Sequence, residues 1–327
     1  MKIAVIDDYQ GVFRELSNFH RLSAHEVVTF SAPERDMDRL AERLREFDAV
    51  VLTQERTRFR RGLIEQLPNL RLISMTGGTA AIDLDACTER GIVVSAGGGR
   101  GSPNETAELT CRGGGLILAS LRHLPFEVEQ LKQGAWQTTL GTSLGGRTLG
   151  IYALGKIGSV VANVGRAFGT DVVCWGREGS LGRAREAGYE VAASRAAFFQ
   201  TVDVLSIHLP LNADTRGIIT ADDLARMKST ALLVNTSRAP IIAEGALVEA
   251  LRRGRPGFTA IDVYEDEPVL GAEHPLLKMP NVIGTPHLGY VTRDRYESMY
   301  GATIEHILAF ANGSPILVAN PAALAKG

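Results

Sequence analysis

The chain has 327 residues, 45% hydrophobic and 22% charged, a composition typical of a soluble globular protein long enough for two domains. Its 35 basic and 37 acidic residues give a formal net charge of −2 and form no basic block, so neither nucleic acid nor an anionic membrane is expected as a partner. No apolar run approaches the roughly 20 residues that span a bilayer.

The N-terminus and the cysteines favour a cytoplasmic protein. Residues 1–10, MKIAVIDDYQ, enter a strand-like run directly and lack the long apolar region and cleavage site of a signal peptide. Cys87, Cys111 and Cys174 are odd in number and widely spaced, without a C-x-x-C pair. Thiols of this kind are typical of a reducing compartment, and no metal site is expected.

Short apolar runs alternate with amphipathic segments over the first hundred residues. The segments 34–47 and 83–90 have helical periodicity and lie between β-branched runs. Such alternation predicts an α/β domain with a parallel sheet covered on both faces, ending near residue 98. Its strands are expected at 2–7, 48–53, 70–76 and 91–96.

A glycine-rich stretch at 97–101 marks a boundary, and a helix is expected to begin after it. Ser102 can cap this helix, Pro103 fits its first position, and Glu105 stands where a capping box requires an acid. The helix then meets RGGG at 112–115, and three glycines in a helix interior cost about 3 kcal/mol relative to alanine. We expect a break or bulge there.

A second alternating series predicts a larger α/β domain. Its strands are expected at 148–154, 171–176, 203–209, 231–237, 258–264 and 281–287, with helices at 156–168, 221–228 and 244–253. The segment 293–313 has the pattern of one long helix, which cannot form a domain alone and is expected to pack on the first one. The predicted domains are therefore 1–98 plus 290–327, and 99–289.

Residues 148–160, TLGIYALGKIGSV, come close to two phosphate-binding loops. The dinucleotide fingerprint G-x-G-x-x-G is matched at Gly155 and Gly158, with Ala153 in place of the first glycine on the condition that its φ is negative. The P-loop needs a hydroxyl after Lys156, where Ile157 stands, and it would put Gly150 inside a strand. The dinucleotide interpretation is favoured.

The adenosine end of a dinucleotide should lie about 20 residues further on, where NAD-binding sites place an acid on the ribose. Gly176 and Arg177 stand there, and arginine suits the additional phosphate of NADP. This favours NADP(H) slightly. Glu178 is adjacent, however, and Arg177 as a solvated surface charge is the alternative.

Polar residues also follow four strands of the second domain. His208 with Pro210, the run 235–238, the run 262–267 and His287 all stand at expected carboxyl ends, where open parallel sheets bind ligands. An arginine can hold a carboxylate with two hydrogen bonds, and a histidine oriented by a carboxylate can supply a proton. The set suits reduction of a 2-keto acid, although each residue alone could be structural.

Five segments, in this order and spacing, resemble the D-isomer-specific 2-hydroxyacid dehydrogenases, a family that includes phosphoglycerate dehydrogenases and glyoxylate/hydroxypyruvate reductases. They are LGIYALGKIG, DVLSIHLPLNADTRGII, ALLVNTSRAPI, AIDVYEDEP and NVIGTPHLGYVT. The first-domain segment LRLISMTGGTAAIDLDACTERGIVV is similar to the family's loop for the substrate carboxylate. The resemblance implies two Rossmann-like, doubly wound parallel-sheet domains with the active cleft between them, and a homodimer.

The resemblance also implies hydride transfer between the nicotinamide of NAD(P)H and C2 of a small D-2-hydroxy or 2-keto acid. Arg238, Glu267 and His287 would be catalytic, with His287 as acid/base, and Gly77 and Gly78 would bind the substrate together with Arg238 and His287. Asp262 would contact the nicotinamide carboxamide. The predicted cofactor contacts are Gly155, Lys156, Ile157, Gly158, Gly176, Arg177, His208, Pro210, Thr236, Ser237, Asp262 and Gly289.

The chain also departs from the family pattern. Ala153 and Ala239 replace glycines, Ala243 stands where an acid is frequent, and the loop TGGTAAID is short. The short loop leaves glyoxylate, hydroxypyruvate and a phosphoglycerate-like acid open as substrates. A non-catalytic NAD(H) sensor is the competing function, and a formate dehydrogenase-like activity is a third that the Glu267–His287 pairing disfavours.

Overall fold

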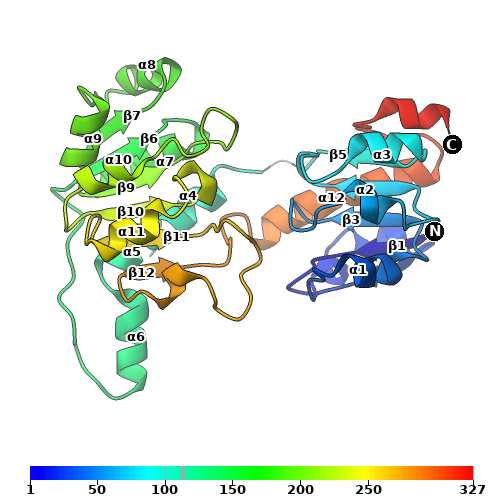
Figure 1. Ribbon diagram of the computed structural model, residues 1–327, viewed down its shortest axis with the longest axis horizontal. Helices are drawn as coiled ribbons and strands as arrows, with labels where there is room; N and C mark the ends of the chain where they lie inside the picture. The colour runs from blue at the N-terminus through cyan, green and yellow to red at the C-terminus, as the bar shows by residue number, and fades with distance from the viewer. Residues whose placement is uncertain (100, 112–114, 327) are drawn as a thin grey trace. The chain divides into compact units, whose positions relative to one another are not determined.

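The computed structural model describes residues 1–99, 101–111 and 115–326, and its contacts divide the chain into two units (Figure 1). Unit 1 comprises Met1–Gly101 and Thr292–Gly327, and unit 2 comprises Ser102–Val291. Each unit is an α/β domain built on an all-parallel sheet, as the alternation of strand and helix patterns predicts.

Unit 1 contains a five-stranded sheet of order β2-β1-β3-β4-β5. The strands are β1 (Lys2–Val5), β2 (Glu26–Thr29), β3 (Ala49–Leu52), β4 (Leu72–Met75) and β5 (Val93–Ala96). One face packs on α1 (Met37–Leu44), α2 (Arg61–Ile64) and α3 (Leu84–Glu89). The edge strand β2 was not predicted from the sequence.

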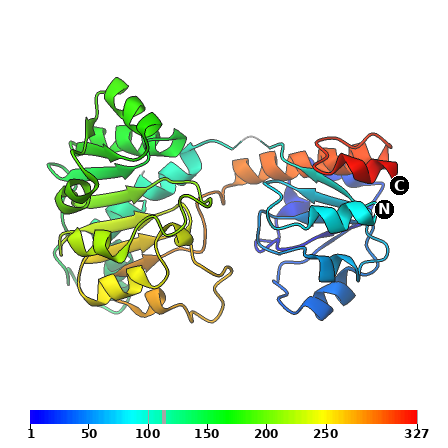
Figure 2. The ribbon, with the colours of Figure 1, turned by 45° about the horizontal axis from the view of Figure 1, so that its top comes forward.

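The other face of this sheet is covered by α12 (Arg293–Ala311), which lies along the strands in Figure 2. Its Tyr300 hydroxyl lies 2.8 Å from Thr53 Oγ1, and its His306 Nδ1 lies 3.0 Å from Ser74 Oγ. These three-dimensional contacts join residues 1–101 to a helix that follows almost 200 residues later.

Unit 2 contains a seven-stranded sheet of order β12-β11-β10-β9-β6-β7-β8. The strands are β6 (Thr148–Tyr152), β7 (Asp171–Trp175), β8 (Glu190–Val191), β9 (Val204–Ile207), β10 (Leu232–Asn235), β11 (Phe258–Ile261) and β12 (Val282–Gly284). Gly150 lies inside β6, where a Cβ would come within 2.5 Å of Val202, so this glycine serves packing and the P-loop interpretation fails.

Both faces of this sheet are covered (Figure 2), and the aliphatic residues of the strands alternate between two cores. One core includes residues of α9 (Arg195–Thr201), α10 (Ala221–Arg226) and α11 (Ala246–Arg252). The other includes residues of α4 (Asn104–Cys111), α5 (Leu116–Leu121), α7 (Lys156–Ala167) and α8 (Glu178–Glu186).

The start of α4 is capped as the sequence predicts. Ser102 Oγ accepts the backbone N–H of Asn104 at 3.1 Å, and Glu105 accepts that of Ser102 at 3.3 Å. The expected break at 112–115 falls largely on 112–114, outside the described residues. Gly115 is the N-cap of α5, and a Cβ there would lie 2.5 Å from the Glu108 carbonyl oxygen.

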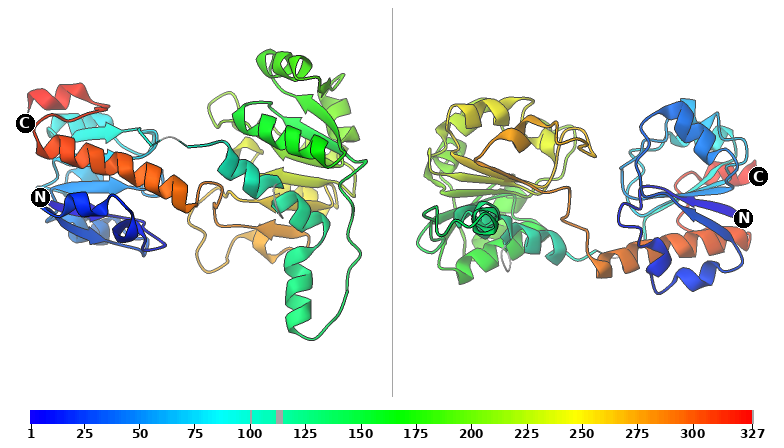
Figure 3. Two further views of the ribbon diagram at one scale, coloured as in Figure 1. Left: turned by 180° about the vertical axis from the view of Figure 1, so that it is seen from behind. Right: turned by 90° about the horizontal axis from the view of Figure 1, so that it is seen from below.

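Helix α6 (Leu124–Lys132) has no buried residue and projects from the rest of unit 2 together with the segment that follows it (Figure 3). The exposed apolar side chains of this projecting region are Leu124, Phe126, Val128, Leu131, Trp136 and Leu140. No helix in the described part of the chain is both long and apolar enough to cross a membrane.

Candidate active site

The glycine turn between β6 and α7 has the geometry of a dinucleotide site, with one difference from expectation. Ala153 has a φ of +75°, so the condition on which alanine was expected to replace the glycine is not met. The backbone follows the path that the absent glycine would take, although an L-residue is strained there. Gly158 is required for packing, because its Cβ would lie 2.6 Å from the Ala153 carbonyl oxygen.

Gly155 is free of any such restriction from within the chain. It is the N-cap of α7, it makes no side-chain cap, and a Cβ there would meet nothing within 4 Å. A helix N-terminus attracts anions because its first N–H groups point outward unpaired. The open space in front of Gly155 therefore fits a pyrophosphate, which Gly155, Lys156 and Ile157 would hold at the start of α7.

His208 stands beside this turn, at the end of β9. Its Nε2 lies 2.9 Å from Ser206 Oγ, and its Cδ2 would lie 3.4 Å from a Cβ at Gly158. Burial lowers the pKa of His208 to about 4, so the ring is neutral at physiological pH. The structure thus places His208 close to the expected pyrophosphate without giving it a positive charge.

The adenosine side of the predicted site lies at the start of α8. Gly176 packs tightly, with a Cβ position 3.1 Å from Ser180 Oγ. Arg177 is exposed and forms an ion pair with Asp214 across 3.0 Å. Exposed pairs of this kind contribute little stability, about 0–1 kcal/mol, so the guanidinium can readily exchange its partner for another anion.

Three other predicted cofactor residues, Ser237, Thr236 and Pro210, make hydrogen bonds within unit 2 at this edge of the sheet. Ser237 donates from Oγ to the Ile207 carbonyl, and Thr236 shares a hydrogen bond with Thr110 of α4. The Pro210 carbonyl accepts from Thr215 at 2.6 Å. These contacts shape the strand ends, and any cofactor contact made by the three residues stays a prediction.

The centre of the site is a histidine–carboxylate pair. His287, three residues beyond β12, has its Nδ1 2.6 Å from Glu267 Oε2, and both side chains are partly exposed. Because a carboxylate is an acceptor, Nδ1 carries the proton in this bond, which leaves Nε2 for a substrate. His287 has a φ of +53°, so the loop holds it in a conformation that side chains rarely adopt.

The environment of Glu267 keeps it ionised. Burial raises the pKa of its carboxyl, but the hydrogen bond and charge of His287 outweigh burial, aided by the Tyr264 N–H and the charge of Arg238. The net effect is a pKa below the ordinary value. A carboxylate that stays charged can stabilise the imidazolium that forms when His287 takes up a proton.

Asp262 holds the loop that carries His287. Its side chain is fully buried and accepts hydrogen bonds from Thr285 Oγ1 at 2.6 Å, Leu288 N at 2.7 Å and Gly289 N at 2.8 Å. Burial raises the pKa of Asp262, and these donors oppose the rise. The predicted contact of Asp262 with the nicotinamide is not visible here, whereas its anchoring of residues 285–289 is.

Gly289 belongs to the same anchor. Its carbonyl accepts from Thr106 Oγ1 of α4 at 2.9 Å, and a Cβ at this position would lie 3.2 Å from Asp262 Oδ2. A larger residue would therefore push on the buried carboxylate. The structure gives Gly289 a packing role, and its cofactor contact stays a prediction.

Arg238 stands just beyond β10, with an exposed side chain. Its Nη1 donates to the Ser237 carbonyl at 2.7 Å, and Asn235 Nδ2 donates to the Arg238 carbonyl at 3.0 Å. Among the residues that the structure describes, no carboxylate forms an ion pair with this guanidinium. Its remaining donors suit an incoming carboxylate, and its charge acts on Glu267.

The two predicted substrate glycines lie in unit 1, after β4. Gly78 is exposed, with nothing within 4 Å of its Cβ position, whereas a Cβ at Gly77 would lie 3.2 Å from Gln54 Oε1. Gln54 has a φ of +56°, and its Nε2 lies 3.5 Å from Met299 Sδ. The positive φ of Gln54 was not predicted, because neither its identity nor its neighbours in the sequence signal it.

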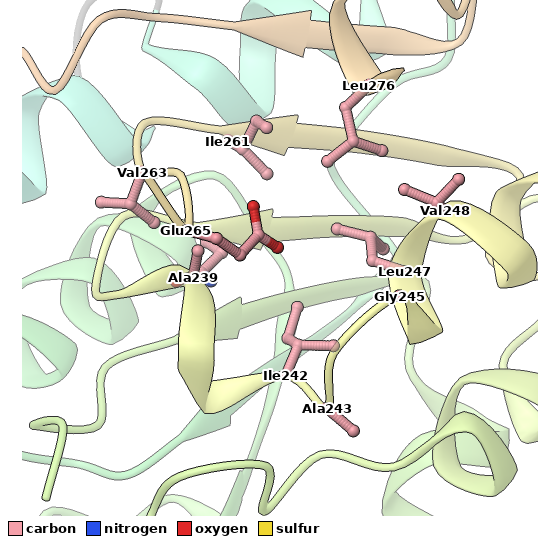
Figure 4. A pocket seen from close by; sticks show the side chains of 11 residues that line it. Ala239, Ile242, Ala243, Gly245, Leu247, Val248, Ile261, Val263, Glu265 and Leu276 are labelled. Atoms are coloured by element: carbon pink, nitrogen blue, oxygen red, sulfur yellow. The ribbon is translucent and has the colours of Figure 1, made fainter. Parts of the chain in front are cut away.

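A small cavity lies behind the Arg238 loop in unit 2. Its volume is about 20 Å³, room for one water molecule, and the Glu265 carboxylate points into it (Figure 4). Ala239 and Ala243, two departures from the family pattern, both line it. The cavity is too small for a substrate.

Comparison with known proteins shows the family to which the chain is similar. Residues 114–289 match the family model described as "D-isomer specific 2-hydroxyacid dehydrogenase, NAD binding domain". The chain is 38% identical over 261 residues to a glyoxylate reductase of Aeropyrum pernix, and the aligned region covers 77% of this chain and 76% of that protein. It is 34% identical over 279 residues to a D-3-phosphoglycerate dehydrogenase of Methanocaldococcus jannaschii, covering 84% of this chain but only 52% of that protein.

A solved structure supports the same assignment. The phosphoglycerate oxidoreductase from Vibrio cholerae O395 superposes with a TM-score of 0.91 at 47% identity, covering 96% of this chain and 100% of that one. These relatives are enzymes, and none supports the non-catalytic sensor. The chain belongs to the D-isomer-specific 2-hydroxyacid dehydrogenase family and is an NAD-binding oxidoreductase of 2-hydroxy acids.

Proposed function

We propose that the chain reduces a small, unphosphorylated 2-keto acid to the D-2-hydroxy acid. The observation that carries this proposal is the 2.6 Å contact between His287 Nδ1 and Glu267, which leaves Nε2 to give its proton to the substrate oxygen. The nicotinamide cofactor, when bound, supplies the hydride that goes to C2.

In this proposal Arg238 binds the substrate carboxylate and polarises the adjacent carbonyl. Its exposed guanidinium has donors available, and a bidentate pair with a carboxylate fixes both distance and plane. Glu267 keeps its charge and stabilises His287 in the protonated form. The backbone N–H groups of Gly77 and Gly78 are proposed as further donors to the substrate.

The carboxyl edge of the unit 1 sheet supports an unphosphorylated substrate. Arg56 is the arginine nearest to Gln54 in the sequence, and its guanidinium is already engaged. It donates to the Asp7 carbonyl at 2.5 Å and to the Tyr296 hydroxyl at 3.3 Å, and it stacks on Tyr9 with its centre 4.3 Å from the ring. Gln54 itself is neutral and lies beside Gly77, so this position offers hydrogen bonds where a phosphate would favour a cation.

Among the cofactors, we propose NADP(H) ahead of NAD(H), on the position of Arg177. Because its ion pair with Asp214 is exposed, a 2′-phosphate can take the place of the carboxylate. The variant Arg177→Leu is expected to weaken NADPH binding about tenfold and to leave NADH binding within twofold. Equal affinity of the unsubstituted protein for both cofactors would contradict the preference.

We further propose a cytoplasmic homodimer, with 1–98 plus 290–327 as the substrate domain and 99–289 as the dinucleotide-binding domain. The projecting region of unit 2 exposes Trp136 (75%) and Leu140 (94%), a degree of exposure that favours burial against a second copy. Cys87, Cys111 and Cys174 are all buried, and their odd number and wide spacing are typical of a reducing compartment. Sedimentation of the Trp136→Ser/Leu140→Ser variant as a monomer, beside a dimeric parent, is the expected result.

The experiment that tests the main proposal follows NADH and NADPH oxidation with a panel of glyoxylate, pyruvate, hydroxypyruvate and phosphohydroxypyruvate. We expect turnover with the unphosphorylated acids and its loss in His287→Ala, by about 10²- to 10⁴-fold in kcat, with cofactor affinity unchanged. A marked preference for the phosphorylated acid would overturn the substrate assignment. Turnover that survives His287→Ala would overturn the assignment of the acid/base.

A further inference from the structure

The glycine turn of unit 2 is held from outside by two side chains of α8. The backbone N–H of Leu154, between Ala153 and Gly155, donates to Ser180 Oγ at 2.7 Å. The carbonyl of the same residue accepts from Arg183 Nε at 2.8 Å. Leu154 is only 1% exposed, so α8 satisfies both backbone groups of a buried residue.

This support matters because of the residue before Leu154. Ala153 has a φ of +75°, a conformation that costs an L-residue about 1–2 kcal/mol and that glycine adopts freely. A strained residue of this kind persists only where its surroundings fix the backbone. The Ala153 N–H donates to the Trp175 carbonyl at 2.8 Å, so the end of β7 and the side chains of α8 hold the turn together.

The first turn of α8 also packs directly on the glycine turn. Ser180 is buried, at 6% exposure, and the Cβ position of Gly176 lies 3.1 Å from Ser180 Oγ and 3.5 Å from Ala153 Cα. A residue larger than glycine at 176 would separate the two segments. Gly176, Ser180 and Ala153 therefore form one packed unit between the start of α8 and the start of α7.

We infer that Ser180 and Arg183 are positioning residues for the cofactor pyrophosphate. They hold Leu154, and through it Gly155 and the N-terminus of α7, in the conformation that presents unpaired N–H groups to an anion. The hydrogen bonds from α8 thus stabilise a backbone conformation that a glycine at position 153 would adopt without strain. The inference rests on the proposed cofactor site at Gly155–Gly158.

The test measures binding rather than turnover, by titration calorimetry of the full chain with NADH, ADP-ribose and adenosine. The variants Ser180→Ala and Arg183→Leu are expected to raise the Kd of NADH and of ADP-ribose by about 5- to 20-fold, the effect of one lost hydrogen bond. The Kd of adenosine, which lacks the pyrophosphate, should change less than twofold. Glu186→Ala, an exposed residue at the far end of the same helix, is the matched control and should leave all three values unchanged.

A second substitution distinguishes this role from general support of the fold. Adding Ala153→Gly to Ser180→Ala should restore the Kd of NADH to within about twofold of the parent, because glycine takes the turn without help. A loss that Ala153→Gly does not relieve, or one equal for adenosine and ADP-ribose, would overturn the inference. Thermal melts identify any variant that fails to fold, in which case Arg183→Leu, which removes only the carbonyl contact, decides.

The failure of this inference and that of the proposed cofactor site give different results. If the parent protein binds neither NADH nor ADP-ribose, the cofactor site itself is wrong. If the parent binds both and the two α8 variants bind them equally well, only the role of α8 is wrong.

Discussion

The carboxyl edges of the two sheets are built alike but end in different chemistry. Each edge holds residues other than glycine at positive φ, Asp7 and Gln54 in unit 1 and Ala153 and His287 in unit 2. In unit 1 several of the polar groups bond one another, as Thr53 and Tyr300 do, although the buried hydroxyl of Thr76 has no hydrogen-bond partner among the described residues. In unit 2 the His287–Glu267 pair is partly exposed, and donors remain available nearby.

This difference shows that the α/β architecture positions side chains at an edge without deciding what they do there. An edge whose polar groups are already paired contributes shape and backbone donors. An edge with an exposed cation and an oriented histidine contributes reactivity. The following substitutions, made in matched pairs across the two edges, test that distinction.

The largest effect is expected from a pair of arginines. Arg238→Leu should lower kcat/KM by about 10³-fold, because it removes a bidentate contact with the substrate, and should leave the melting temperature unchanged. Arg56→Leu should destabilise the fold by about 2 kcal/mol, because its bonds to Asp7 and Tyr296 are lost, while activity per folded molecule falls far less. Steady-state kinetics and urea unfolding separate the two results, and similar kinetic losses in both variants would contradict the comparison.

A smaller effect is expected from two buried aspartates, Asp262 in unit 2 and Asp8 in unit 1, each of which accepts backbone hydrogen bonds from a loop. Asp262→Asn replaces an acceptor of three hydrogen bonds and is expected to cost about 2 kcal/mol and to lower kcat, because the His287 loop loses its anchor. Asp8→Asn, in unit 1, removes an acceptor of the Val12 and Phe13 N–H groups. It should cost a similar free energy of unfolding with no change in kcat, and a matching fall in kcat would argue against the anchor.

A still smaller effect is expected on acidification, which should lower the free energy of unfolding of both units because each contains a buried histidine. Burial lowers the pKa of His208 to about 4, and it also lowers the pKa of His306. Below about pH 6.5 these histidines therefore bind protons in the unfolded chain but stay neutral in the native state. Stability is therefore full above pH 6.5 and falls as the pH drops towards 4, by about 2 kcal/mol for His208 between pH 7 and 5. Urea unfolding of His208→Asn should show a smaller loss over this range, and an unchanged loss would refute the assignment.

Most of the architecture could be predicted because local sequence patterns indicate the strands and helices. Runs such as DAVVLT and ALLVNTS are β-branched or aliphatic over the length of a strand, and the polar residues that follow them mark the carboxyl edge. The His287–Glu267 contact followed from the family resemblance. Strand β2 was missed because EVVT is short and has a charged first residue, and α8 was missed because two glycines interrupt its pattern.

The features that could not be predicted depend on contacts between distant residues. The positive φ of Ala153 occurs in a turn whose backbone groups bond Ser180, Arg183 and Trp175, none of which is local in sequence. The burial of Asp262 behind the loop 285–289 likewise follows from packing against α4, which lies far earlier in the chain. The motifs therefore predict the site, while the structure shows the contacts that hold its loops.

The contacts of α12 also bear on the order in which the chain can fold during synthesis. Residues 1–101 leave one face of their sheet uncovered until Tyr300 and His306 are made, because those side chains complete the packing around Thr53 and Ser74. Unit 2, by contrast, is encoded without interruption and emerges whole before α12 does. We expect unit 2 to fold on the ribosome while unit 1 still lacks α12. The apolar sheet face that α12 will cover is then exposed in the nascent chain, and it is the surface that most needs a chaperone.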